Sequence, residues 1–355
     1  MNVLDRLTAR KILIRAVNWI GDAVMTAPAI VAVRESFPEA EITLLANPLV
    51  SQLFSPHASI DRVITFDRSS KHKGISGRLR LAYELRKESF DAVIILPNSF
   101  DSALVPWLAG IPVRLGRKSD GRSLLLTHGY VPDTVAEKCH EVQQYLTLME
   151  HFGIHGEAFQ PNLETTMVED ASVAVFLKEQ GVLPDDFLLG INPGATFGSA
   201  KRWYPERFAE AATKIASRLN TRIIVFGGKD EIEIAAEIQA DILDKCINVA
   251  GKTTIRQLMA LLKRCNFLIT NDSGPMHVAA ALGVPLAAVF GPTDHSGTAP
   301  FTSRAVIIRK ETDCAPCKLR ECPIDHNCMT AVTADDVVDV VMHFLRDRNM
   351  ATEKL

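Results

Sequence analysis

Residues 267–290 read FLITNDSGPMHVAAALGVPLAAVF, and this stretch decides the fold class of the chain. Residues 267–270 form a short apolar run, which is typical of a buried parallel strand. A helix of small residues is expected at 276–282, and a second apolar strand at 286–290. Two strands joined in this way form a βαβ unit, whose connecting helix packs on a parallel sheet.

The same alternation of strand and helix extends outward from this unit. Residues 334–346 are expected to form the last helix. Upstream, we expect strands at residues 11–16, 41–45, 62–66, 92–96, 187–192 and 222–226, and helices at 23–37, 79–87, 205–219, 231–243 and 255–265. Alternation on this scale predicts an α/β protein with parallel sheets covered by helices on both faces.

The length of the chain points to two domains. It has 355 residues, which is more than one hydrophobic core usually holds. The alternation lapses at residues 159–167, a polar stretch that contains Pro161 and that we interpret as a linker. We therefore expect one doubly wound domain at residues 1–165 and another at 166–333, followed by a helix at 334–355.

Composition excludes some classes of function. Hydrophobic residues make up 47% of the chain and charged residues 23%, as in ordinary globular proteins. The net charge of −3 gives no basic surplus, so we expect no binding to nucleic acid. Charges interrupt residues 1–7, so we expect no signal peptide. These features predict a soluble cytoplasmic protein, which could still visit a membrane surface.

Four loops carry unusual residues at the carboxyl ends of expected strands, where open parallel sheets bind their ligands. The first loop is Trp19-Ile20-Gly21-Asp22. Asp22 stands at the start of a helix, where it is either an N-cap or a general base that faces the cleft. The residues alone leave both interpretations open.

The second loop, residues 192–196, reads NPGAT and leads to Lys201. Its backbone N–H groups, the Thr196 hydroxyl and the Lys201 ammonium would suit a diphosphate. A cation near a helix entry opposes the helix dipole, which favours an anion site over an ordinary exposed loop.

The third loop, residues 226–231, reads FGGKDE. Gly227 and Gly228 would allow a ligand to approach the backbone closely. Asp230 and Glu231 either bind ribose hydroxyls or simply open the next helix. No G-x-G-x-x-G follows the first strand, which weakens the case for a dinucleotide dehydrogenase.

The fourth loop, residues 270–277, reads TNDSGPMH and is the most specific local pattern in the chain. It follows a strand and opens a helix, so the backbone amides of residues 273–277 can face a phosphate at the helix N-terminus. A lone Asp-Ser-Gly would be only a turn, but the strand before it and the helix after it favour a phosphate-binding loop over a simple turn.

Seven cysteines are present, an odd number that suits a reducing compartment. Cys139, Cys246 and Cys265 are isolated and expected to be buried. The other four lie in one turn-rich segment, near His326 as a spare ligand: Cys314, Cys317, Cys322 and Cys328. They would suit a structural zinc ion or an iron–sulfur cluster, and the alternative is a loop of free thiols. Neither interpretation makes the segment catalytic.

A basic stretch occupies part of the first half of the chain. It consists of Lys71, Lys73, Arg78, Arg80, Arg86 and Lys87. Such a stretch is either a solvated helix face or a contact surface for a phosphate-bearing acceptor or lipid head groups.

Taken together, the loops resemble glycosyltransferase family nine, the ADP-heptose–lipopolysaccharide heptosyltransferases. The resemblance extends from Lys11 to about Val341. The matching residues are Gly21-Asp22, the NPGA of residues 192–195 with Lys201 and Trp203, Gly227-Gly228, and the DSGPMH of residues 272–277. The WIGD of residues 19–22 and the LPNSF of residues 96–100 are similar to those members that add the second heptose of the core.

The resemblance implies a GT-B fold, with two Rossmann-like domains facing a central cleft. It implies that the acceptor binds the first domain, that ADP-heptose binds the second, and that the last helix returns to the first. It also implies inversion at the anomeric carbon without an obligatory metal. The implied reaction transfers L-glycero-D-manno-heptose to heptosyl-Kdo2-lipid A, the inner core of lipopolysaccharide, with peripheral contact to the inner membrane.

The same resemblance implies a role for each matching residue. Asp22 would activate the acceptor hydroxyl, and Lys201 would neutralise the leaving diphosphate. Acceptor contacts would come from Trp19, Asn98 and Ser99. Donor contacts would come from Thr196, Gly227, Gly228, Lys229, Asp230, Glu231, Asp272, Ser273, Gly274, Pro275, Met276 and His277.

Three other functions compete with this expectation. The first is a heptosyltransferase acting at another core position, where it would add the first or third heptose. The second is a sugar-nucleotide epimerase on the same fold, which would need an acid and a base within the donor half. The third is a metal-binding or redox module built on residues 314–328.

Overall fold

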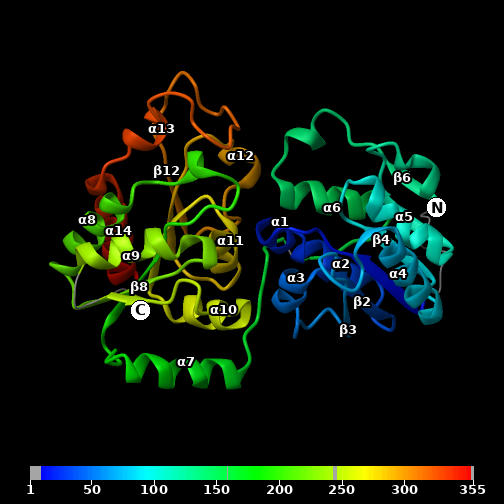
Figure 1. The fold of residues 1–355 in the computed structure, drawn as a ribbon, viewed down its shortest axis with the longest axis horizontal. Helices are drawn as coiled ribbons and strands as arrows, with labels where there is room; N and C mark the ends of the chain where they lie inside the picture. The colour runs from blue at the N-terminus through cyan, green and yellow to red at the C-terminus, as the bar shows by residue number, and fades with distance from the viewer. Residues whose placement is uncertain (1–8, 158, 243–245, 353–355) are drawn as a thin grey trace. The chain divides into compact units, whose positions relative to one another are not determined.

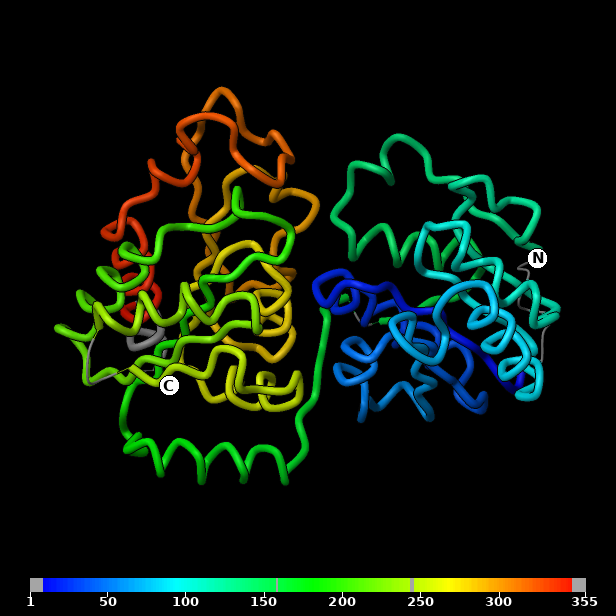
Figure 2. The backbone as a smooth tube through the Cα atoms, in the orientation of Figure 1, coloured from blue at the N-terminus to red at the C-terminus, as the bar shows by residue number. Residues whose placement is uncertain are grey.

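The computed structural model describes residues 9–157, 159–242 and 246–352. The chain divides into two compact units, Met1–Glu164 and Thr165–Leu355, which follow each other along the chain in Figure 2. Residues 1–7 and the ends of the helices expected at 231–243 and 334–355 lie outside the described residues. No helix among the described residues has the length and apolar character needed to cross a membrane.

The first unit contains a sheet of six parallel strands in the order β3-β2-β1-β4-β5-β6. The strands are β1 (Lys11–Arg15), β2 (Glu41–Ala46), β3 (Arg62–Thr65), β4 (Ala92–Ile95), β5 (Val113–Arg117) and β6 (His128–Tyr130). The helices are α1 (Ile20–Met25), α2 (Ala27–Ser36), α3 (Pro48–Leu53), α4 (Gly74–Glu88), α5 (Phe100–Ala109) and α6 (Glu141–His151), with short 3-10 helices η1 (Arg122–Leu125) and η2 (Ala136–Lys138).

The second unit contains a sheet of six parallel strands in the order β12-β11-β10-β7-β8-β9. The strands are β7 (Phe187–Asn192), β8 (Thr221–Val225), β9 (Cys246–Asn248), β10 (Phe267–Asn271), β11 (Leu286–Val289) and β12 (Ala305–Ile308). The helices are α7 (Met167–Glu179), α8 (Pro205–Ala216), α9 (Ile232–Ile242), α10 (Ile255–Arg264), α11 (Gly274–Ala281), α12 (His295–Thr298), α13 (Asn327–Thr330) and α14 (Ala334–Thr352), with 3-10 helices η3 (Ser199–Lys201) and η4 (Lys229–Glu231).

Both sheets are wound in the same way. If the strands of each unit are numbered from one to six, both sheets have the order 3-2-1-4-5-6, which is the doubly wound arrangement that the sequence predicted. The winding direction reverses between β1 and β4 in the first unit and between β7 and β10 in the second. Loops beyond the carboxyl ends of these strand pairs therefore mark the two expected ligand sites.

The core strands have apolar side chains on both faces because helices cover both sides. All described side chains of β4 and β11 are buried, and so is every residue of β10. Figure 1 shows the helices of each unit distributed around its sheet. The prediction from residues 267–290 is confirmed, since β10, α11 and β11 form the expected βαβ unit.

One local prediction needs correction. The helix expected at residues 23–37 is two helices, because Thr26 ends α1 and precedes Pro28 in the first turn of α2. The helix expected from residue 334 is present as α14, whose Val337, Val338 and Val341 are buried in the core of the second unit, where α14 packs against α8, β11 and β12.

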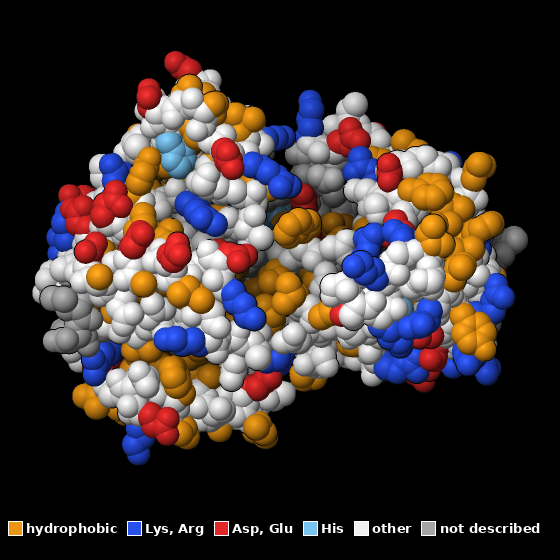
Figure 3. Space-filling model, viewed as in Figure 1, with side chains coloured by type: hydrophobic (Ala, Val, Ile, Leu, Met, Phe, Trp, Pro, Cys, Tyr) orange, Lys and Arg blue, Asp and Glu red, His pale blue; other side chains and the backbone are white. Residues whose placement is uncertain are grey.

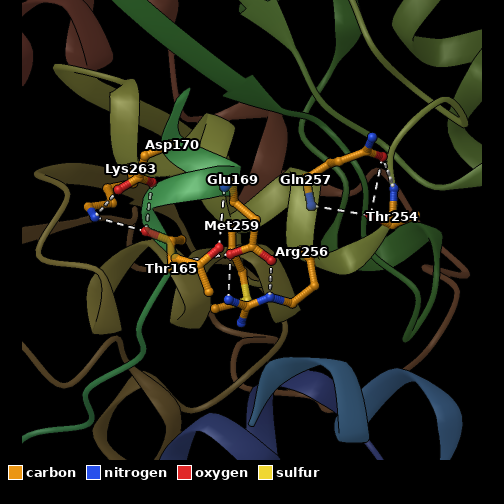
Figure 4. A network of polar contacts seen from close by, with 9 residues as sticks. Thr165, Glu169, Asp170, Thr254, Arg256, Gln257, Met259 and Lys263 are labelled. Carbon is orange, nitrogen blue, oxygen red and sulfur yellow. Dashed lines mark hydrogen bonds and ion pairs between the residues drawn. The ribbon is translucent and has the colours of Figure 1, made fainter. Parts of the chain in front are cut away.

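Helix α7 follows the unit boundary and is fastened to α10 by ion pairs (Figure 4). Arg256 donates to both carboxylate oxygens of Glu169, at 2.7 and 2.6 Å, and Lys263 contacts Asp170 at 2.8 Å. Thr166 and Glu169 also form a capping box at the start of α7. These contacts fix the first turn of α7 on the second unit.

Candidate active site

Asp22 lies at the switch point of the first sheet, directly after β1. It is the third residue of α1, and the N-cap position belongs to Trp19, whose side chain makes no capping bond. The N-cap interpretation of Asp22 is therefore wrong. Its carboxylate stands in a first turn, where the helix dipole favours a negative charge.

Asp22 lines a cavity of about 170 Å³ that lies entirely within the first unit. The other lining residues come from the ends of β4, β5 and β6, from η2 and from α6: Leu96, Asn98, Arg117, Tyr130, Pro132, Ala136, Glu141, Gln144, Tyr145 and Leu148. Two carboxyls, one guanidinium, two amides and two phenols therefore converge there. Such a mixture suits a polyhydroxylated ligand rather than an apolar one.

Glu141, the first residue of α6, also lines the cavity and was not expected from the sequence. Burial and, to a smaller extent, the nearby Asp22 carboxylate together raise the pKa of Glu141 to about 7. The pKa of Tyr145 is raised by burial and by the same two carboxylates. A pair of carboxyls at one cavity, of which one keeps its proton near neutral pH, is typical of sites that transfer protons.

The three expected acceptor residues occupy different positions. Asn98 lines the cavity with Asp22. Ser99 is the N-cap residue of α5 without a side-chain capping bond, and its carbonyl oxygen accepts from Arg122 and Ser102. Trp19 is 59% exposed and lies outside the cavity lining.

The second unit has its own polar network at the switch point between β7 and β10. Asn192 Nδ2 donates to Thr270 Oγ1 at 3.2 Å and to Ser273 Oγ at 3.0 Å. Asn271 bridges the two loops, because it donates to the Pro193 carbonyl at 2.7 Å and accepts from the Trp203 N–H at 3.0 Å. These bonds hold the second and fourth predicted loops together.

Lys201 forms an ion pair with Asp272 in this network. Its Nζ lies 2.6 Å from Asp272 Oδ2, and only 13% and 6% of the two side chains are exposed. The Thr293 hydroxyl donates to the same carboxylate oxygen. The structure thus brings together two residues that lie 71 positions apart, and Asp272 fixes the position of the Lys201 ammonium.

The glycine loop after β8 packs on the loop after β7. The Gly228 N–H donates to Glu231 Oε2 at 2.7 Å, so Glu231 caps its own turn, as the helix-opening interpretation predicts. A Cβ on Gly194 would lie 1.8 Å from Glu231 Oε1, so a side chain there would displace the Glu231 carboxylate from its present position. Lys229 and Asp230 are exposed.

Helix α11 begins at Gly274, with Ser273 as its N-cap residue and Pro275 in its first turn. Its first turn contains no acidic residue, which leaves the positive end of the helix dipole uncompensated from within the helix. Met276 and His277 are buried. Thr196 is exposed, whereas Trp203 is fully buried and donates from Nε1 to the Val332 carbonyl at 3.0 Å.

The cysteine-rich segment packs on the Lys201 loop. The Ala200 N–H donates to the Arg320 carbonyl at 3.0 Å, and His326 Nε2 contacts the Ala200 carbonyl at 2.7 Å. His326 is therefore engaged with the loop rather than available as a metal ligand. The segment positions η3, and with it Lys201.

All seven cysteines are free thiols. Burial, followed by the neighbouring thiols of Cys314, Cys317 and Cys322, raises the pKa of Cys328 to about 11. No three His, Cys, Asp or Glu side chains are arranged to hold a metal within the part of the chain that the structure describes. Of the isolated cysteines, Cys265 is buried as expected, whereas Cys139 and Cys246 are partly exposed.

A Gly198→Ala substitution tests the contact between this segment and the Lys201 loop. A Cβ at position 198 would lie 2.1 Å from the Arg320 carbonyl oxygen, so one backbone segment must move. We expect a loss of roughly 1–3 kcal/mol in the free energy of unfolding. Gly297→Ala is the matched control, because nothing lies within 4 Å of its Cβ. Equal unfolding curves for the two variants would contradict the prediction.

Only some residues of the basic stretch in the first unit form ion pairs. Lys71 pairs with Glu84 at 2.9 Å, and Arg78 pairs with Asp101. Arg86 donates to the carbonyl of Leu108 at 2.9 Å. For Lys73, Arg80 and Lys87, no ion pair exists with any other described residue.

Comparison with known proteins bears on the chemistry of these sites. Residues 78–327 match the family model described as glycosyltransferase family 9 (heptosyltransferase). The chain is 33% identical to lipopolysaccharide heptosyltransferase 2 of Salmonella typhimurium, over 84% of this chain and 88% of that protein. The structure of ADP-heptose lps heptosyltransferase II from E. coli matches with a TM-score of 0.81 and 29% identity, over 96% of this chain and 99% of that chain. A family 9 glycosyltransferase from Veillonella parvula matches with a TM-score of 0.88 and 25% identity, over the same shares of the two chains.

Proposed function

The chain belongs to glycosyltransferase family 9, the heptosyltransferases, and we propose that it transfers L-glycero-D-manno-heptose from ADP-heptose to heptosyl-Kdo2-lipid A. Its fold is GT-B, like that of the heptosyltransferase structures it resembles. The observation that carries the proposal is the similarity to heptosyltransferase 2 proteins over most of the chain. The comparisons favour this activity over transfer at another core position and over an epimerase.

The first unit supplies the acceptor side of the proposed reaction. Asp22 takes the proton from the acceptor hydroxyl as its oxygen attacks the anomeric carbon. Attack from the side opposite the leaving group inverts that carbon. Asn98 and Arg117 line the same cavity and would bind hydroxyl or acidic groups of the acceptor sugars.

The second unit supplies the donor side. As the bond to ADP breaks, negative charge grows on the diphosphate, and a prepositioned cation lowers the barrier. Lys201 provides that cation, with Thr196 beside it in the same loop. Asp272 repels phosphate and pairs with Lys201, so we assign it a positioning role. The backbone N–H groups of Ser273, Gly274, Met276 and His277 at the start of α11 bind the diphosphate, and the loop of residues 227–231 binds the nucleoside.

We propose that Glu141 keeps its proton up to about pH 7 and donates a hydrogen bond to the acceptor or to Asp22. The unfolded chain would lose this proton near the ordinary pKa of 4.5. Between these two values the folded state binds more protons, so the contribution of Glu141 to stability falls as the pH rises, and the loss is complete above pH 7.

Glu141→Gln cannot ionise and should lack this decline. We expect the variant to gain stability over the parent protein as the pH rises from 4.5 to 7.5, by about 3 kcal/mol at most. Its rate should also lose the inflection near pH 7. Thermal unfolding and initial rates across this range measure both effects. Glu150→Gln, an exposed site on the same helix, is the control, and identical pH profiles for Glu141→Gln and the parent would refute the assignment.

A structural metal ion on Cys314, Cys317, Cys322 and Cys328 is a separate part of the proposal. Four thiols in one segment form a ligand set that zinc or iron accepts, although their described arrangement brings no three together. The reaction uses no step through this metal. Elemental analysis of purified protein should find about one zinc ion, or the iron of one iron–sulfur cluster, per chain. If only trace amounts of metal are found, the segment is a loop of free thiols instead.

We propose that the reaction takes place at the cytoplasmic face of the inner membrane, where peripheral contact would bring the lipid acceptor to the enzyme. The test is transfer from ADP-heptose to two acceptors, Kdo2-lipid A and heptosyl-Kdo2-lipid A, followed by mass spectrometry. Product from the heptosylated acceptor alone supports the proposal. Product from the bare Kdo acceptor would assign the first heptose instead, and product from neither would reopen the choice of donor.

A further inference from the structure

The outer side of α4, α5 and η1 exposes six large hydrophobic side chains, which we call the apolar face. On α4, Ile75, Leu79 and Tyr83 recur at every fourth residue, so they lie one above another. They are 77%, 53% and 60% exposed. The other members are Phe100 (42%) and Trp107 (47%) on α5 and Leu124 (93%) on η1.

These three elements form one fixed layer. The opposite side of α4, with Leu81 and Leu85, is buried in the core that it shares with α5 and with Leu125 of η1. The Arg86 guanidinium donates to the Leu108 carbonyl at the end of α5. The exposed members of the apolar face therefore point away from the sheet and cannot turn inward without unpacking the core.

Acidic groups in this layer are neutralised, whereas several cations are not. Glu88 pairs with Arg62 at 2.6 Å, and Glu84 pairs with Lys71. Asp101 is paired as well, with Arg68 and Arg78. Lys87 Nζ lies 4.5 Å above the Tyr83 ring. Figure 3 shows hydrophobic and basic side chains intermingled on the side of the first unit that carries α4 and α5.

We propose that the apolar face, together with Lys73, Arg80 and Lys87, docks on the surface of an anionic lipid membrane. Aliphatic and aromatic side chains flanked by cations are the composition of interfacial helices. Tyr and Trp favour the headgroup region, and unpaired cations are attracted to acidic lipids. A second copy of the chain fits less well, because a two-fold contact would bring the three cations against their own like charges.

The apolar face adjoins, along the chain, a segment that lines the acceptor cavity. Asn98 lines that cavity, and Phe100 of the apolar face follows two residues later. Docking through Phe100 would therefore bring this segment toward the headgroup layer. The importance of docking for the reaction rests on the proposed function, since a lipid acceptor must be taken from a membrane. Vesicle binding itself does not depend on the reaction.

Sedimentation with vesicles tests the proposal on the full chain without acceptor or donor. We expect binding to vesicles of phosphatidylcholine with 30% phosphatidylglycerol, roughly tenfold weaker binding to phosphatidylcholine alone, and release at high salt. The triple variants Ile75→Ser/Leu79→Ser/Tyr83→Ser and Lys73→Glu/Arg80→Glu/Lys87→Glu should each raise the lipid concentration for half-binding by roughly tenfold or more.

The matched control is Met167→Ser/Val168→Ser/Val175→Ser on α7, whose three side chains are 88%, 79% and 58% exposed. It should bind vesicles like the parent protein, and equal loss in the control would overturn the proposal. So would an absence of binding by the parent, or a parent dimer that the α4 serine variant dissociates. Transfer to an acceptor without its lipid chains should be unchanged in the α4 variants. If the parent protein itself does not catalyse this transfer, the result contradicts the proposed function but not the docking on membranes.

Discussion

Asp22→Asn is expected to lower kcat by roughly 10²- to 10⁴-fold, the contribution typical of a positioned general base. Asparagine has nearly the shape of aspartate but cannot accept a proton from the acceptor hydroxyl. Asp22 belongs to the cavity of the first unit, whereas the proposed donor residues belong to the second. The affinity for ADP, measured by calorimetry, should therefore stay within about twofold of the parent value.

Two comparisons make this result specific. Asp185→Asn changes an exposed carboxylate in the same manner and should leave the rate unchanged. The unfolding curve of Asp22→Asn should show that the variant is folded. If Asp22→Asn keeps more than about a tenth of the parent kcat, another group must take the proton, and Glu141 would be the first to examine.

Lys201→Ala is expected to lower kcat/KM by roughly 10²- to 10³-fold, because it removes a prepositioned cation from the leaving diphosphate. Both donor affinity and kcat should fall, since charge on the diphosphate is present before the transition state and grows in it. The substitution also leaves Asp272 buried without its partner. That uncompensated charge should destabilise the fold by about 3 kcal/mol.

The double variant Lys201→Met/Asp272→Asn separates these two effects. It removes the cation without leaving a buried unpaired carboxylate, so it should unfold at a denaturant concentration close to that of the parent. Its rate should nevertheless be as low as that of Lys201→Ala. Normal kinetics in the double variant would mean that Lys201 only neutralises Asp272.

The fold was predictable because strands buried on both faces have continuous apolar runs that end at glycine-containing loops. The strands at residues 187–192 and 267–271 were expected with nearly their observed bounds. Four strands were missed: β5, β6, β9 and β12. Strands β6, β9 and β12 are short and lie at the edges of the sheets, and β5 carries polar residues such as Arg114. Residues of edge strands are less buried, and therefore the pattern of hydrophobic residues in their sequences is less pronounced.

Candidate site residues could be predicted from the sequence only in the segments that follow a predicted strand. Asp22 and Asp272 stand in such loops, so the topology assigns them to the carboxyl edge of each sheet. Glu141 begins a helix after an irregular segment. Because it lies far from Asp22 in the sequence, nothing in the sequence indicates that the two carboxyls line one cavity. Its raised pKa depends on burial by residues from several strands, which only the assembled cavity reveals.

The winding order of the sheets has a consequence for synthesis on the ribosome. All pairings of the first sheet lie within residues 11–130, and all pairings of the second lie within residues 187–308. Neither sheet therefore waits for a strand from the other half of the chain. The amino-terminal half can therefore form its hydrogen-bonded sheet while the carboxyl-terminal half is still being translated.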